Sequence, residues 1–406
     1  MSVRKRVAVA VTAGAVALTA AACGSSSSSS STAAAAGSGG SGGNATPITL
    51  AASVELTGPA SAIGKTWQHG IELAVAAANG KDGFTVAGKK YRWKLDLQDN
   101  QSTADQAIAQ YRAFAGAGDT FILGPGLTSA FLPAFNSFGA GKGIVLTPSA
   151  AAAQAKPQPG QSLFITNNTG QSATVNSVVK ATVQKYTPKT VAILLPQDSA
   201  GQLYGNLYAA AFAAEGVNVV YKKQFPSGTS DFNSYIAGIK ALSPDMVVTG
   251  YLDSIVQPFI TQALGAGLTD PVFVGTFGSD SAALGSNANS VKGYSWPVPT
   301  RAVDNAADPS VASYRTAWKA AYGSFPTAAD AQSLAFYDPV LVLTQALVKA
   351  GSVTDTAAIS KAFLEVTSWP QQVMKETFDP TSHTALYPHQ IGVYDKGAVT
   401  YLDAPS

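Results

Sequence analysis

The chain has 406 residues with a formal net charge of +2, and only 12% of its residues are charged. Three of its 26 Lys and Arg residues lie at positions 4–6, so the rest of the chain is close to neutral against 24 Asp and Glu. This balance gives no reason to expect nucleic acid as a partner, and a body of about 360 residues exceeds one hydrophobic core, so two domains are expected.

The N-terminus has the pattern of a secretory signal peptide. A basic start at residues 4–6 is followed by an uncharged run at 7–22 that ends in three alanines before Cys23. The run is shorter than the roughly 20 residues that span a bilayer. The segment 18–24, LTAAACG, resembles a lipobox, in which the Cys becomes the first mature residue and carries the acyl chains. We therefore expect residues 1–22 to be removed and Cys23 to anchor the protein to the outer face of the cell membrane; the alternative is an ordinary signal peptide with an incidental Cys.

The segment 23–46 is predicted to be a flexible linker, because nearly all of it is Ser, Gly and Ala. Such a composition cannot bury apolar surface, and about 20 residues of it span roughly 25 Å on average. Beside a lipid anchor it would act as a tether, although low complexity without a role is the alternative.

From residue 48 on, short apolar runs alternate with amphipathic segments. The first series predicts strands at 48–52, 91–97, 121–123 and 144–146, and helices at 64–79, from Ser102 or Thr103 to about 117, and from about 129. The second series predicts strands at 191–195, 217–221, 246–248 and 272–274, and helices at 171–185, 201–215, 231–242 and 255–266. This alternation is typical of βαβ units, so the predicted fold is α/β with two doubly wound, Rossmann-like lobes. Helices at 310–322, 331–349 and 356–365 and a hairpin near 390–401 are expected to complete it.

Few residues of the kind that carry catalysis or bind metals are present. The three His residues have no metal-ligand spacing, the single Cys is assigned to the lipid, and no G-x-G-x-x-G after a strand, P-loop or G-x-S-x-G occurs. We therefore expect no enzyme activity, no metal and no cofactor. A hydrolase with widely separated Ser, His and Asp on an α/β frame remains an alternative.

Polar loops follow two of the predicted strands. Gly124–Ser129 comes after the strand at 121–123, and Thr147–Ala150 comes after the strand at 144–146. Ligands of open α/β sheets bind beyond the carboxyl ends of the strands, where helix N-termini receive anions. A binding edge is therefore predicted; for any single residue, an N-cap or tight turn is the alternative.

These loops carry a resemblance to a known family. The segments LTGPAS at 56–61, DNQS at 99–102, FILGP at 121–125, TPSA at 147–150, TSDF at 229–232 and AFYD at 335–338 resemble those of the leucine/isoleucine/valine-type binding proteins, the substrate-binding components of ABC importers. The resemblance implies two α/β lobes joined by a three-segment hinge, the type I periplasmic binding protein fold, with a small ligand enclosed between them and an ABC permease in the membrane as partner. It places residues 47–168 and 298–375 in lobe 1, and 169–297 and 376–406 in lobe 2.

The resemblance also implies which residues bind the ligand. A ligand carboxylate would be held by Thr128 and Ser129 and by the backbone of Ser149, Ala150 and Ala151. Tyr251 would close on the ligand from lobe 2.

Several positions depart from the family pattern. The family's Tyr-Gly falls on Ala200–Gly201, so Tyr204, one turn later, is a substitute; the ammonium-binding Thr falls on Ala151; and the acidic partner of the ammonium falls on Phe277. A buried ammonium without an anionic partner would be costly. Asp253 or Asp280 could reach in as that partner, although neither aligns with the family position. The sequence therefore predicts a ligand other than a plain branched-chain amino acid, more apolar or aromatic, with contacts from Phe277, Tyr251 and Trp67. The alternative to transport is a ligand-sensing module of the same fold. Genes for permeases and ATPases next to the gene for this protein would exclude that alternative.

Overall fold

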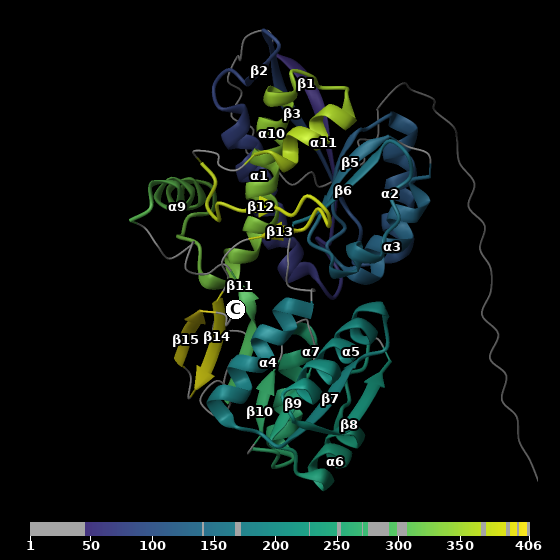
Figure 1. Ribbon diagram of the computed structural model, residues 1–406, viewed down its shortest axis with the longest axis vertical. Coiled ribbons are helices and arrows are strands. Elements are labelled where there is room, and N and C mark those ends of the chain that lie inside the picture. The colour runs from purple at the N-terminus through teal and green to yellow at the C-terminus, as the bar shows by residue number, and fades with distance from the viewer. Residues whose placement is uncertain are drawn as a thin grey trace, which may run out of the picture. The chain divides into compact units, whose positions relative to one another are not determined.

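The computed structural model describes residues 45–139, 142–166, 172–226, 228–249, 253–269, 271–274, 292–298, 307–366, 371–386, 390–395 and 398–403. These parts of the chain form two main β-sheets, each covered by helices on both faces (Figure 1). We call the six-stranded sheet and its helices the first lobe, and the seven-stranded sheet and its helices the second lobe. The architecture confirms the predicted α/β fold with two doubly wound lobes.

The first sheet is parallel except at one edge. Its order is β2 (Phe84–Val86), β3 (Lys89–Asp99), β1 (Thr46–Val54), β4 (Phe121–Leu123), β5 (Gly143–Thr147) and β6 (Gln161–Ile165), with only β2 antiparallel to its neighbour. Successive side chains of a strand point to opposite faces. Thus Leu50 and Ala52 pack into one core while Ala51 packs into the other.

Helices from both ends of the chain cover this sheet. One face carries α1 (Ser61–Asn79), α9 (Pro309–Tyr322), α10 (Leu334–Ala350) and α11 (Thr356–Leu364), and the other carries α2 (Ala104–Ala117) and α3 (Thr128–Ser137). Helix α10 is buried along most of its length, from Leu334 to Leu347. The side chain of Thr103 accepts a hydrogen bond from the amide of Gln106, which confirms one of the two predicted N-caps of α2.

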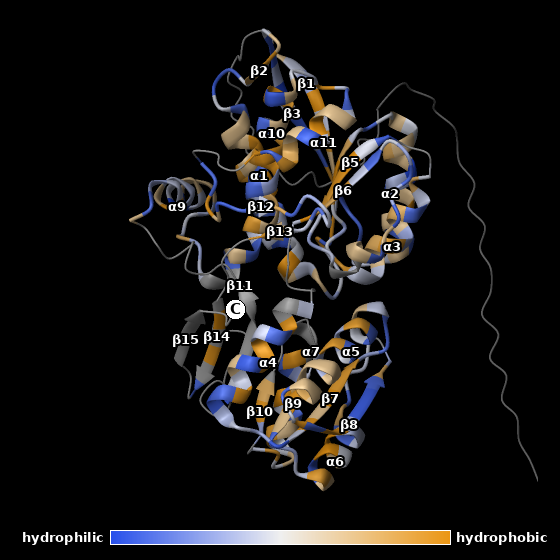
Figure 2. Ribbon diagram, viewed as in Figure 1, coloured by the Kyte–Doolittle hydropathy of each residue, from blue (hydrophilic) through white to orange (hydrophobic). Residues whose placement is uncertain are grey.

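The second sheet combines five parallel strands with a terminal hairpin. Its order is β8 (Asn218–Phe225), β7 (Thr190–Pro196), β9 (Met246–Val248), β10 (Val272–Val274), β11 (Lys292–Val298), β14 (Gln390–Asp395) and β15 (Ala398–Asp403). Strands β14 and β15 form the predicted antiparallel hairpin, and β14 pairs antiparallel with β11. Figure 2 shows the inner strands β7, β9 and β10 as hydrophobic, whereas the edge strand β8 carries hydrophilic residues.

Four helices cover the faces of the second sheet. Helices α4 (Ser172–Tyr186) and α5 (Ser199–Ala214) enclose one core, and α6 (Asn233–Leu242) and α7 (Asp253–Gly265) enclose the other. All four were expected from the sequence, with bounds that differ by a few residues. Among the residues described, no helix is long and apolar enough to span a bilayer.

The third crossing between the lobes differs from the prediction. The sequence assigns residues 376–406 to the second lobe. Strands β12 (Thr377–Phe378) and β13 (Ala385–Leu386) instead form a small sheet of their own, and Phe378 and Ala385 pack into the core of the first lobe. The amide of Ile165 also donates to the carbonyl of His383. The chain therefore stays with the first lobe through residue 386, because Phe378 and Ala385 are buried in its core and Thr384 bridges to Ile165 of β6. The other two predicted boundaries fall next to residues outside the described ranges and stay predictions.

Five strands and one helix start were missed, among them the two-residue strands β12 and β13. Strands β2, β6 and β11 are short or carry Gly, Ser and Pro, so their sequences lack a clear alternation. The helix expected from residue 331 begins at Leu334, after a 3-10 helix, η3 (Ala328–Ser333). The amide of Thr327 donates to the carboxylate of Asp330 at 2.8 Å, and this bond belongs to a capping box that starts η3.

Candidate functional site

The carboxyl ends of the parallel strands β1, β4, β5 and β6 meet at one edge of the first sheet, and the predicted binding loops follow them. The loop after β4 begins with a cis peptide bond between Gly124 and Pro125. Gly124 has φ of 71°, and a Cβ there would lie 2.2 Å from the carbonyl oxygen of Ser53. Only Gly fits both conditions, and the Tyr111 hydroxyl donates to the Gly124 carbonyl beneath.

A buried carboxylate holds the second half of this loop. Glu55, directly after β1, is 0% exposed, and its Oε1 accepts hydrogen bonds from the amides of Gly126 at 3.1 Å and Leu127 at 3.0 Å. The Asn100 side chain also hydrogen-bonds to it. Burial raises the pKa of Glu55, and the bonds from Leu127, Asn100 and Gly126 oppose that rise. The carboxylate thus lies at the positive N-terminal end of α3.

The two predicted carboxylate-binding residues of this loop open helix α3. Thr128 is its first residue and is 7% exposed, and Ser129 follows, half-buried. Leu127, the N-cap, gives no side-chain bond to the helix. Thr128 and Ser129 therefore sit where backbone amides of a helix start remain without intrahelical partners.

The loop after β5 is tied to the loop after β4. The hydroxyl of Thr147 donates to the carbonyl of Pro125 at 2.6 Å and accepts from the amide of Ser149 at 3.1 Å. Ser149 is fully buried, and within the described part of the chain its hydroxyl has no hydrogen-bond partner. Ala150 and Ala151 begin the 3-10 helix η1 (Ala150–Gln154). The structure thus brings the loops of Thr128 and Ser149 together, as predicted.

Two hydroxyls at strand ends were missed by the sequence analysis. Thr166 directly follows β6, its amide donates to the Thr147 carbonyl at 2.8 Å, and its buried hydroxyl finds no acceptor or donor among the described residues. In the second lobe Thr249 follows β9, and its buried hydroxyl also has no hydrogen-bond partner among the described residues. Glu55 was missed too, although an acidic residue directly after an apolar strand is a pattern that can indicate a functional position. A buried polar atom without a partner is costly, so the hydroxyls of Thr166 and Thr249 are candidates to meet a bound polar group.

Trp67 and Tyr204 lie in hydrophobic cores. Trp67 is 4% exposed and packs edge-on against Phe336, with ring centroids 6.2 Å apart, directly beneath Gly126. Tyr204 is 7% exposed within the core formed by α4, α5 and the second sheet, and burial raises the pKa of its phenol. Trp67 therefore supports the loop from below, and a direct ligand contact of either residue stays a prediction.

Other expected residues lie outside the described ranges. They are Cys23, Tyr251, Phe277 and Asp280. Asp253 is the first residue of α7.

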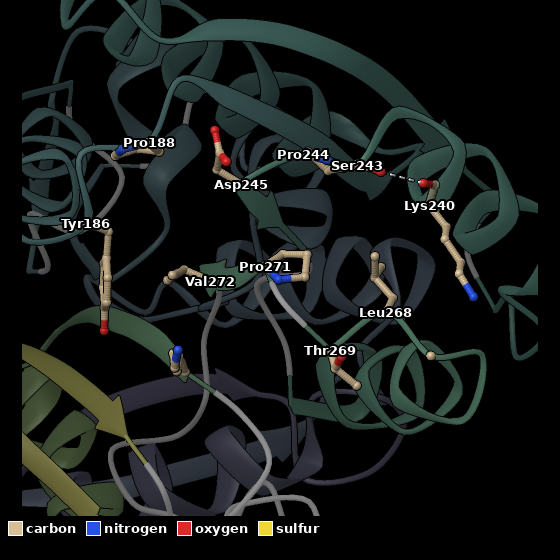
Figure 3. Close-up of a pocket in the computed structure, with 12 residues that line it drawn as sticks. Tyr186, Pro188, Lys240, Ser243, Pro244, Asp245, Leu268, Thr269, Pro271 and Val272 are labelled. Carbon is tan, nitrogen blue, oxygen red and sulfur yellow. Dashed lines mark hydrogen bonds between the residues drawn. The ribbon is translucent and has the colours of Figure 1, made fainter.

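A cavity of about 440 Å³ opens in the second lobe, at the edge of the sheet where its parallel strands begin. Its walls come from the connections that lead into β7, β9 and β10, together with Lys292 at the start of β11. Figure 3 shows Pro271 and Val272 between Tyr186 on one side and Leu268 and Thr269 on the other. Because these are the amino ends of the strands, the cavity is distinct from the predicted binding edge.

Comparison with known proteins agrees with this architecture. The family model described as "Periplasmic binding protein" matches residues 47–398. The chain is similar to a Leu/Ile/Val-binding protein homolog 3 of Brucella melitensis, with 24% identity over 88% of this chain and 94% of that protein.

Solved structures share the fold. A leucine binding protein from Thermotoga maritima has a TM-score of 0.72 at 19% identity, covering 87% of this chain and 97% of that one. A solute binding protein from R. palustris in complex with benzoate has a TM-score of 0.68 at 18% identity, covering 89% and 97%. With two doubly wound lobes, polar loops at the carboxyl edge of the first sheet and a family match over nearly all of its body, the chain belongs to the periplasmic binding protein family.

Proposed function

We propose that this protein is the extracytoplasmic solute-binding component of an ABC importer. It captures a small organic molecule between its two lobes and delivers it to a permease in the membrane, without catalysis. The observation that carries this proposal is the pair of polar loops joined by the Thr147–Pro125 hydrogen bond at the edge where such folds bind ligands.

The proposed ligand is an amino acid, an amide or an aromatic or carboxylate compound. On the first lobe its polar group would meet Thr128, Ser129 and Ser149, together with the backbone at Ala150 and Ala151. On the second lobe Tyr251 and Phe277 are the proposed apolar contacts, with Tyr204 and Asp280 as further candidates there. On the first lobe Trp67 is a further candidate. Structural neighbours include a leucine binding protein and a benzoate-bound protein, which fits the amino acid and the aromatic carboxylate in this list.

Family membership supports export of the protein from the cytoplasm. We add to this the proposal that Cys23 carries a lipid and that residues 23–46 tether the two lobes to the outer face of the membrane. A tether confines the protein near its permease, because about 20 flexible residues keep the body within a few tens of ångströms of the surface.

Native mass spectrometry of protein purified from its own host tests the ligand proposal first, since a retained molecule would appear as a defined added mass. Isothermal titration against amino acids, their amides and aromatic acids then measures affinity. We expect at least one compound to bind, with a heat signature that disappears when the loops after β4 and β5 are altered. Absence of binding across all three classes would overturn the proposal.

A further inference from the structure

We propose that Glu55 determines the ligand specificity of this site, so that the site prefers an uncharged head group, such as a primary amide, over a carboxylate. This inference rests on the proposed function and names the chemical class of its ligand. It concerns the loops that follow β1, β4 and β5 in the first lobe.

The first argument concerns hydrogen-bond donors. Backbone amides at the start of α3 are the groups that would receive an anionic ligand. Two amides of this loop, at Gly126 and Leu127, already point at Oε1 of Glu55. These two are therefore occupied by a group of the protein itself, and a ligand carboxylate cannot use them. Of this loop's backbone donors, only the amides at Thr128 and Ser129, the first residues of α3, are left for a ligand.

The second argument concerns charge. Glu55 is fully buried, and among the described residues no cationic side chain contributes to its pKa. The segments 53–58, 99–103, 124–129 and 147–154 contain neither Lys nor Arg. Burial, and then the negative charge of Glu55, raise the pKa of the Tyr111 phenol. The charge of Glu55 therefore acts on a neighbouring group beneath the loop. A second carboxylate near Thr128, the residue after Leu127, would therefore meet a like charge within the roughly 10 Å over which charges act even in salt.

The third argument concerns what is left to bind a ligand. The side chains gathered at this edge are hydroxyls, at Thr128, Ser129, Ser149 and Thr166, and those of Ser149 and Thr166 have no partner within the described ranges. A hydroxyl donates and accepts. A neutral amide, which offers two N–H donors and one carbonyl oxygen, suits such a set better than a carboxylate, which only accepts.

Titration of the wild-type protein with matched pairs tests this inference, using benzamide against benzoate and isovaleramide against isovalerate. We expect each amide to bind at least tenfold more tightly than its acid. Glu55→Gln should reduce that ratio about tenfold, because the Gln carbonyl oxygen can keep both bonds that Oε1 now accepts while the charge is lost. Asp105→Asn is the matched control, since it removes one charge from an exposed position of the first lobe and should leave the ratio unchanged.

A wild-type site that binds the acids more tightly, or a ratio that Glu55→Gln changes by less than twofold, overturns the inference while leaving the proposed function intact. Failure to bind any of these or other small organic molecules would instead contradict the proposed function. If Glu55→Gln does not fold, the same ratio measured in wild type between pH 8 and pH 5 decides. For benzamide against benzoate it should fall as the pH is lowered and Glu55, whose pKa burial raises, takes up a proton, while benzoic acid, with a pKa of about 4, stays mostly ionised.

Discussion

The indole ring of Trp67 lies against Gly126, so closely that a Cβ on residue 126 would come within 2.1 Å of Trp67 Cζ3. Trp67 comes from α1 and Gly126 from the loop after β4. The Trp67 side chain, part of the first lobe's core, thus sets how closely the binding loop can approach α1.

Gly126→Ala tests this contact. We expect a loss of about 1–3 kcal/mol of stability, because the new methyl group must displace a packed ring, and a weaker ligand affinity if the loop moves instead. Thermal unfolding and isothermal titration measure the two effects. Gly116→Ala is the control, because nothing lies within 4 Å of a Cβ there. Adding Trp67→Leu to Gly126→Ala should cost less than the two single changes together; additive costs would contradict the contact.

A pair of buried carboxyl groups predicts how stability depends on pH. Burial raises the pKa of Asp338 in α10, although it accepts the amides of Val373 and Met374, and burial and then the charge of Asp338 raise the pKa of Glu376. Since each folded pKa lies above its unfolded value of about 4, stability is fully present below that pH and is lost as the pH rises through the folded values. Melting temperature should therefore fall from pH 5 to pH 8.

The two carboxyl groups should respond differently to amide substitution. Glu376 has no hydrogen-bond partner among the described residues, so Glu376→Gln should raise stability at pH 8 by about 1.4 kcal/mol for each unit of pKa shift removed. Asp338→Asn should destabilise, because one of the two backbone amides loses its acceptor. Melting curves of both variants at pH 5 and 8 check this. A pH-independent melting temperature in wild type would refute it.

The hydroxyls at the binding edge should contribute to affinity. Thr128→Val and Ser149→Ala each remove one hydroxyl with little change in shape, and we expect each to weaken binding of the identified ligand about tenfold, as a hydrogen bond worth 1–2 kcal/mol predicts. Isothermal titration provides the numbers. Thr182→Val is the control, because its buried hydroxyl donates within α4, to the carbonyl of Val178. Equal affinity in all three variants would exclude these hydroxyls from the site.

Cys23→Ser tests the proposed anchor. We expect the variant to leave the membrane fraction and to lack the added mass of acyl chains, because a Ser hydroxyl does not replace the thiol that carries them. Fractionation followed by mass spectrometry of the intact protein measures both. Ser26→Ala, in the adjacent linker, should stay with the membrane. A Cys23→Ser protein that remains bound to the membrane would rule out the lipid.

Much of the fold could be predicted from the sequence, because the local spacing of apolar residues distinguishes strands from helices. Strands such as β5 and β7 are uninterrupted apolar runs, and α1 keeps its buried residues on one side. Strands β6 and β11 were missed since a short strand is defined by its neighbours in the sheet rather than by its own residues. The placement of residues 376–386 failed for the same reason, because Phe378 contacts a core built from distant segments.

The site was predictable only in part. Its loops were found because polar residues directly follow apolar strands. The role of Glu55 depends on amides more than 70 residues away in sequence, which no local pattern reveals. The burial of Trp67 beneath Gly126 is likewise a consequence of tertiary packing.

The order in which the sheets are completed has a consequence for how the chain folds after export. Helix α10 (Leu334–Ala350) fills the first lobe's core although β1 begins at Thr46, and β14 (Gln390–Asp395), which covers the edge of β11, lies near the end of the described chain. A chain emerging from its N-terminus across a membrane can therefore finish neither lobe until almost all of it has crossed. Contacts between segments this distant in sequence slow folding. Slow folding keeps the chain unfolded while it crosses the membrane.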